Sequence, residues 1–131
     1  MNNKELIVRY PFLRKNLNNT SDEIEYSWFD DIPKGWALAF GEQMCEELLH
    51  ILRKANYVDE YCIMQIKEKY GSLRWYDGGV PEEIWDEYQT WIDKYEGLSY
   101  ATCINCGKPA TIITTGWIYP LCDECAKNAE K

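Results

Sequence analysis

Apolar residues recur at helical spacing between residues 33 and 55. At 100° per residue, one continuous arc of such a helix collects the apolar side chains, and the opposite arc collects charged and polar ones. The apolar arc contains Trp36, Leu38, Phe40, Met44, Cys45, Leu48, Leu49, Ile51 and Leu52. Gly41 lies inside this predicted helix, where glycine costs roughly 1 kcal/mol relative to alanine. We therefore expect another element to pack closely against Gly41.

A second amphipathic helix is predicted over residues 81–96, with Pro81 near its first position and Gly97 just after its end. One side is apolar and mostly aromatic, and consists of Ile84, Trp85, Tyr88, Trp91, Ile92 and Tyr95. The opposite side is acidic, and consists of Glu82, Glu83, Asp86, Glu87, Asp93 and Glu96. Only Lys94 interrupts that acidic side.

Two segments have the character of β-structure. The run "YCIMQIKEKYGSLRWYD" (61–77) contains two β-prone stretches around Gly71 and predicts an antiparallel hairpin with Gly71 in its turn. The segment "ELIVRYPFL" (5–13) predicts a short strand, which Pro11 limits to an edge or an end.

The strongest chemical signal is a pair of C-x-x-C motifs separated by 15 residues, formed by Cys103, Cys106, Cys122 and Cys125. This spacing is typical of a four-cysteine zinc site, and four thiolates leave no coordination position open for catalysis. We expect one structural Zn²⁺, whose binding contributes on the order of 10 kcal/mol to folding. A redox C-x-x-C pair is the less favoured alternative, because such pairs usually precede a helix in a βαβ unit.

Together these elements predict an α+β fold, in which two amphipathic helices pack on a small antiparallel hairpin. Residues 1–100 would form the core, and residues 101–131 a zinc-ribbon subdomain packed on it. The stretches "ATIITT" and "GWIYP" supply the ribbon's own hairpin, with Gly116 near its turn and Trp117 at an exposed tip.

The formal net charge of −8 changes this picture, because zinc ribbons often bind nucleic acid. Most of the excess lies in residues 71–100, with seven acids and two bases, whereas residues 101–131 are balanced. Such a chain repels phosphate backbones and suits a basic partner, so direct nucleic-acid binding is not expected. The acidic side of the second helix is either a solvated surface or a partner-binding patch, and both interpretations stay open.

One basic and aromatic stretch runs against this average, and it is formed by Lys67, Lys69, Tyr70, Arg74, Trp75 and Tyr76. Its aromatic side chains could stack on the bases of single-stranded nucleic acid. We favour the other interpretation, in which these aromatic side chains pack on the two helices. The only histidine, His50, falls on a polar arc, and neither a nucleophile elbow nor a phosphate loop is present. An enzyme is therefore not expected. The sequence lacks an apolar run of membrane-spanning length and a signal peptide, which favours the cytoplasm, where cysteines stay reduced.

Several motifs resemble a family of small zinc-ribbon proteins from phages and other mobile elements, whose functions are mostly unassigned. They are "GEQMCEE" (41–47), "IKEKYGSLRWYDGG" (66–79), "TCINCGKPA" (102–110) and "GWIYPLCDEC" (116–125). In similar sequences the last ligand can be a histidine, whereas here it is Cys125. The chain is also similar in kind to a zinc-bound type II anti-CRISPR, an inhibitor of a CRISPR–Cas nuclease.

This resemblance implies a phage-encoded, non-catalytic protein in the cytoplasm of a bacterial host. It would bind and inhibit a basic nucleic-acid-handling protein, most concretely by blocking nucleic-acid loading of a CRISPR–Cas nuclease. The alternative is a zinc-ribbon, nucleic-acid-binding regulator or assembly factor of a mobile element.

Overall fold

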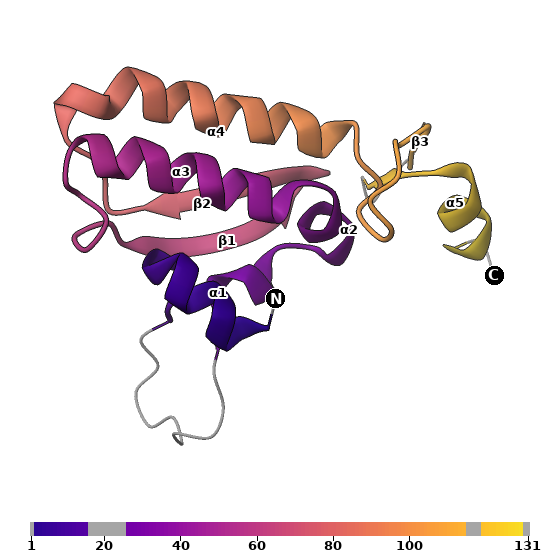
Figure 1. The fold of residues 1–131 in the computed structure, drawn as a ribbon. Coiled ribbons are helices and arrows are strands. Elements are labelled where there is room, and N and C mark those ends of the chain that lie inside the picture. Colours follow the sequence, from indigo (N-terminus) through magenta and orange to yellow (C-terminus); the bar gives the residue numbers. More distant parts are fainter. Residues whose placement is uncertain (1, 16–25, 115–118, 130–131) are drawn as a thin grey trace.

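The computed structural model describes residues 2–15, 26–114 and 119–129, and it has an α+β fold (Figure 1). Its helices are α1 (Asn3–Arg9), α2 (Lys34–Trp36), α3 (Glu42–Lys54), α4 (Trp85–Tyr100) and α5 (Asp123–Ala129). The strands form two antiparallel pairs, β1 (Ile63–Lys69) with β2 (Ser72–Asp77), and β3 (Ile112–Ile113) with β4 (Pro120–Leu121). In the described part of the chain, no helix is both long and apolar enough to span a bilayer.

The first element is a helix, so the strand predicted over residues 5–13 is wrong. The side chain of Asn2 caps α1 by accepting a hydrogen bond of 2.9 Å from the Glu5 amide. The helix buries Leu6 and Ile7. An apolar run as short as this one fits a strand and a helix equally well, so the sequence pattern does not distinguish them. A 3₁₀ turn, η1 (Pro11–Leu13), follows α1.

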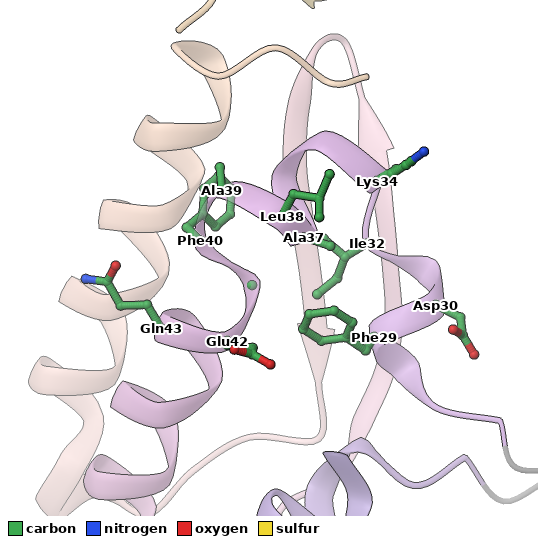
Figure 2. A pocket seen from close by; sticks show the side chains of 11 residues that line it. Phe29, Asp30, Ile32, Lys34, Ala37, Leu38, Ala39, Phe40, Glu42 and Gln43 are labelled. Atoms are coloured by element: carbon green, nitrogen blue, oxygen red, sulfur yellow. The ribbon is translucent and has the colours of Figure 1, made fainter. Parts of the chain in front are cut away.

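The helix predicted over residues 33–55 is present, but it contains a π-helical segment, η3 (Ala37–Gly41), between α2 and α3. Gly41 faces the ring of Phe29, and a Cβ atom on Gly41 would lie 2.7 Å from the Phe29 Cζ atom. The expectation of a close approach at Gly41 is therefore confirmed. Because the π segment shifts the helical register, Leu38 leaves the apolar arc and is 68% exposed. Figure 2 shows Phe29 and Leu38 lining the hollow beside this segment.

The predicted hairpin is also present. Tyr70 and Gly71 form its two-residue turn with φ angles of 54° and 81°, which suit a primed turn. One face of the hairpin is apolar, and its side chains Ile66, Leu73 and Trp75 are buried in the core.

Helix α4 begins after a 3₁₀ turn, η4 (Glu82–Ile84), and continues to Tyr100, so Gly97 lies within the helix and not after its end. Most of the predicted aromatic side is buried, and the indole Nε1 of Trp91 donates a hydrogen bond of 2.9 Å to the Met44 carbonyl on α3. Trp85 is the exception, because it is 49% exposed. The long helices α3 and α4 lie side by side over the hairpin, and α1 lies near β1 (Figure 1).

Candidate metal centre and acidic face

Four cysteine side chains converge at the C-terminal end of the described chain, where their Sγ atoms all lie within 4.8 Å of one another. The Sγ atoms of Cys106 and Cys122 are 3.6 Å apart, and all four thiols are free. A tetrahedron with metal–sulfur bonds of about 2.3 Å has sulfur–sulfur edges of about 3.8 Å. The cluster formed by Cys103, Cys106, Cys122 and Cys125 therefore has the size to hold one metal ion.

The first knuckle (residues 103–108) is a tight turn. The Gly107 amide donates a hydrogen bond of 3.0 Å to the Cys103 carbonyl, and the Cys103 amide donates one of 2.7 Å to the Lys108 carbonyl. Gly107 has a φ angle of 85°, a conformation that glycine adopts without strain. The turn can therefore bring the two sulfurs of this knuckle to the same side.

The second knuckle (residues 120–126) joins β4 to α5. The Cys125 amide points at the Cys122 Sγ atom at 3.5 Å, and the Ala126 amide donates a hydrogen bond of 3.0 Å to the Cys122 carbonyl. The first turn of α5 thus places Cys125 close to Cys122. Backbone amides directed at sulfur stabilise thiolates, which are the form that binds metals.

The cysteine pKa values show how the protein prepares this cluster. Burial raises the pKa of the Cys103 thiol, but amides of Cys122, Cys106 and Asn105 outweigh burial and lower this pKa to about 6. Hydrogen bonding with Cys122 raises the pKa of Cys125 to about 12. Backbone amides thus favour the thiolate form of Cys103, which is the form that binds a metal.

The two knuckles are held together by the short β3–β4 pair. Ile112 is paired with Leu121, and Ile113 with Pro120. This pairing agrees with the short hairpin that "ATIITT" and "GWIYP" predict. The predicted turn at Gly116 and the tip at Trp117 lie outside the described residues.

The first knuckle packs closely on the start of the long helix. The Gly35 amide donates a hydrogen bond of 2.8 Å to the Ile104 carbonyl, and a Cβ atom on Gly35 would lie 2.2 Å from the Cys103 carbonyl oxygen. A Cβ atom on Gly107 would similarly lie 2.7 Å from the Gly35 carbonyl oxygen. These two glycines therefore fix the cluster against the helical core. Sequence reasoning missed the role of Gly35, for which the only signal was a glycine in the predicted first turn.

The metal cluster and the core have separate apolar groups of buried side chains. The larger group joins α1, α2, α3, α4 and the β1–β2 hairpin, whereas the smaller group consists of Cys103, Leu121 and Cys122. Ile104 contacts both groups. The knuckles thus have little apolar burial of their own, and a bound metal would supply most of their local stability.

The acidic face predicted on the second helix is only partly free. Glu87 forms a salt bridge with Lys54, and Glu96 forms one of 3.3 Å with Arg74. Both salt bridges tie the helix to neighbouring elements, so these two acids have a structural role.

The other predicted acids, Glu82, Glu83, Asp86 and Asp93, are exposed and form no salt bridge with the described residues. The half-exposed indole of Trp85 belongs to the same part of the chain, at the start of α4. We call these four acids and Trp85 the acidic face. Acids in the first turns also interact favourably with the helix dipole, but Asp93 in the third turn lies beyond the reach of that effect.

Three groups with reactive chemistry that lie apart from the cluster are His50, Cys45 and the exposed Cys62. His50 is exposed on α3, with its Nε2 atom 3.5 Å from Glu46. Cys45 is fully buried, and burial raises the pKa of its thiol to about 12, so it is a poor nucleophile.

Comparisons with protein-family models, with curated proteins and with solved structures found no match to this chain. The resemblance to zinc proteins of mobile elements therefore stays a prediction from the sequence. The four-cysteine cluster remains the feature of the chain whose chemistry is clearest from its own geometry.

Proposed function

We propose that this protein is a non-catalytic, zinc-stabilised inhibitor that binds a basic surface of a nucleic-acid-handling host protein. Its most concrete target is a CRISPR–Cas nuclease, whose loading with nucleic acid it would block. The observation that carries the proposal is the acidic face, whose four carboxylates are exposed and form no salt bridge with the described residues, and which includes the half-exposed Trp85.

Zinc is the metal that the cluster suits best. Four thiolates at tetrahedral spacing favour Zn²⁺, which binds sulfur at about 2.3 Å and imposes no other geometry. A complete sulfur shell leaves no site for an activated water, so the metal's role is structural. Four thiolates and one Zn²⁺ also make the loaded protein more acidic by about two charges, which favours a basic partner.

The acidic face has the composition of a docking site for a positively charged surface. Its carboxylates form no salt bridge with the described residues, so their charge is available to an incoming lysine or arginine, whereas Glu87 and Glu96 are already paired. Trp85 adds an aromatic side chain of the type that often dominates binding energy when an interface closes over it. Helix α4 is anchored by buried aromatic residues, so it presents these groups on a rigid support.

Inhibition follows from competition for the same positive charge. The channels that hold guide and target in CRISPR nucleases are basic, because they must bind phosphate backbones. A protein bound there through carboxylates excludes nucleic acid without any chemical reaction. Its association should be fast at low ionic strength and should slow as salt screens the charges.

The test measures binding of the zinc-loaded protein to a panel of purified CRISPR–Cas nucleases, with and without guide RNA. The variant Glu83→Lys/Asp86→Lys reverses two charges of the acidic face, and Trp85→Ala removes its aromatic side chain. We expect each variant to weaken binding at least about ten-fold, since a lost anchor typically costs more than 1 kcal/mol.

The matched control is Asp59→Lys/Glu60→Lys, which reverses two exposed acids in the turn before β1 and has the same net charge as the test variant. Equal losses in the control and in the test variant would mean that only overall charge matters. Binding that ignores both variants would rule out the acidic face, and binding to no nuclease of the panel would rule out the proposed target class.

A further inference from the structure

The β1–β2 hairpin has a second face on which several polar side chains are exposed. Successive side chains of a strand point to opposite faces, so Ile66, Leu73 and Trp75 point to the core. The alternate positions form the outer face, where Gln65 is paired with Tyr76 and Lys67 is paired with Arg74 across the strands. The hairpin therefore has one buried apolar face and one largely polar face, which can serve as a platform.

Two tyrosine rings, those of Tyr70 and Tyr76, are exposed on this platform. From the sequence we expect all three aromatic side chains of this stretch to pack on the helices, but only Trp75 is buried. Tyr76 is 43% exposed on β2, and Tyr70 is 67% exposed at the turn. Each ring has a lysine beside it, with the Lys67 Nζ atom 5.8 Å from the centroid of Tyr76 and the Lys69 Nζ atom 5.7 Å from that of Tyr70. Exposed rings with adjacent cations are the pattern of a stacking platform for nucleic acid.

The local charge on the outer face is positive, in contrast to the net charge of −8 for the whole chain. Lys67 and Lys69 form no salt bridge with the described residues, whereas Arg74 is paired with Glu96. The intervening acid, Glu68, belongs to the opposite face by strand alternation and accepts a hydrogen bond of 2.8 Å from the Gly71 amide. The average charge thus conceals a small basic and aromatic surface, which we call the hairpin platform (Gln65, Lys67, Lys69, Tyr70, Arg74 and Tyr76).

We propose that the hairpin platform binds single-stranded nucleic acid, with bases stacked on Tyr70 and Tyr76 and phosphates near Lys67 and Lys69. Base stacking requires unpaired bases, because the faces of paired bases are hidden within a duplex. An exposed strand surface with rings at two places along its length suits an extended single strand. The acidic face lies on a different element, so this binding does not depend on the protein–protein function proposed above.

The number of charges sets the expected strength and salt dependence. Each phosphate contact to a single strand contributes a slope of about −0.7 in log K against log salt, so two lysines predict a slope of about −1.4. Binding is therefore modest and relies on stacking more than on charge. A sequence preference would come from stacking strength and not from hydrogen bonds to base edges.

The experiment uses the zinc-loaded full chain and fluorescent oligonucleotides of about 12 nucleotides, which matches the usual footprint of such platforms. Fluorescence anisotropy at low salt measures affinity for single-stranded DNA and RNA and for a duplex of the same length. We expect single strands to bind at least ten-fold more tightly than the duplex.

Matched variants separate stacking from nonspecific effects. Tyr76→Ala should weaken binding about ten-fold, whereas Tyr76→Phe, which keeps the ring, should bind like the native chain. Tyr100→Ala removes a tyrosine that is 44% exposed on α4 and is not part of the hairpin platform, and it should change nothing. Lys67→Glu should weaken binding and lower the salt slope, whereas Lys4→Glu on α1 should do neither.

Three results would overturn the proposal. The first is the absence of binding at low salt, and the second is equal losses for Tyr76→Ala and Tyr100→Ala. The third is self-association in sedimentation that Lys67→Glu abolishes while oligonucleotide binding persists, because the platform would then serve as an interface for the acidic face of a second copy.

Discussion

The indole Nε1 of Trp36 donates a hydrogen bond of 3.0 Å to the carbonyl oxygen of Thr102. Trp36 is fully buried in α2, and Thr102 directly precedes the first cysteine of the metal cluster. The bond therefore connects the helical core to the point where the chain enters the first knuckle. It complements the Gly35–Ile104 hydrogen bond, which lies one residue earlier on the same helix.

The variant Trp36→Phe tests this connection. Phenylalanine keeps most of the buried apolar area but removes the donor, so the Thr102 carbonyl is left buried without this partner. We expect the free energy of unfolding to fall by about 2 kcal/mol, as measured by urea denaturation, and the metal to bind more weakly. The control Trp85→Phe changes an exposed indole and should cost less than about 0.5 kcal/mol. Equal costs at the two tryptophans would contradict the structural role of Trp36.

A pair of glycine substitutions tests the contact between the knuckle and the helix. In Gly35→Ala, the new Cβ atom would lie 2.2 Å from the Cys103 carbonyl oxygen, so the knuckle or the helix must move. We expect a loss of at least about 2 kcal/mol in the free energy of unfolding, together with weaker metal binding.

The matched control is Gly97→Ala, because Gly97 lies inside α4 and a Cβ atom added there would have no neighbour within 4 Å among the described residues. Alanine is the better helix former, so this variant should gain up to about 1 kcal/mol. Thermal denaturation measures the stability of both variants. If Gly97→Ala were also destabilised, the loss in Gly35→Ala could not be assigned to the contact with the knuckle.

The two long helices and the hairpin could be predicted because each buries one face, and periodicity reports burial directly. The metal ligands could be predicted because the spacing within each C-x-x-C motif is local. By contrast, the run around Leu6 is too short for its period to separate a strand from a helix. Its outcome depends on the Asn2 cap and on long-range packing.

Contacts between distant residues account for the other differences. The role of Gly35 depends on Cys103 and Ile104, far along the chain, and no local pattern indicates that approach. Trp85 lies on the apolar arc of its helix but is 49% exposed, because the buried core does not extend to this end of the helix. Helical periodicity alone therefore predicts its burial wrongly. The pairing of Glu96 with Arg74 similarly requires knowledge of how α4 lies against the hairpin.

Ser99 protects the outer edge of β2, and its removal should be costly. Its Oγ atom accepts a hydrogen bond of 2.9 Å from the Leu73 amide, which points away from β1. In Ser99→Ala this buried amide loses its partner, and we expect the free energy of unfolding to fall by about 1–3 kcal/mol. Hydrogen exchange at the Leu73 amide should accelerate more than at the other amides of β2.

The control for Ser99 is Thr90→Ala on the same helix. Thr90 is exposed, and its hydroxyl donates to the Asp86 carbonyl within α4, so its loss should change stability by less than about 0.5 kcal/mol. If the two variants were equally stable, the edge of β2 would not depend on Ser99.

Tyr10 and Arg9 give Glu46 a pH-dependent role. Hydrogen bonds, first from Tyr10 and then from Arg9, lower the pKa of the Glu46 carboxyl. A pKa that is lower in the folded state stabilises the fold above the unfolded pKa, which is about 4.3, and this contribution is lost as pH falls through the folded pKa. In Tyr10→Phe we expect the Glu46 pKa to rise and the fold to lose less stability on acidification.

Carboxyl chemical shifts followed by NMR across the acidic range measure this pKa, and denaturation at several pH values measures the stability. Tyr100→Phe is the control, because it alters an exposed tyrosine and should leave the Glu46 pKa unchanged. An unchanged Glu46 pKa in Tyr10→Phe would show that the hydroxyl does not stabilise the carboxylate.

Metal removal should loosen the knuckles more than the core. The buried side chains of α1–α4 and the β1–β2 hairpin form one large apolar group. Among the described residues, the separate apolar group of the knuckles has only three buried side chains, Cys103, Leu121 and Cys122. After chelation we expect amides of residues 103–114 and 119–126 to exchange rapidly with solvent, while those of α3 and α4 stay protected. Loss of protection in α3 and α4 at the same chelator concentration would instead mean that core and knuckles fold as one cooperative unit. A Cys106→Ser/Cys125→Ser variant should reproduce the chelated pattern without chelator, because it removes one sulfur ligand from each knuckle.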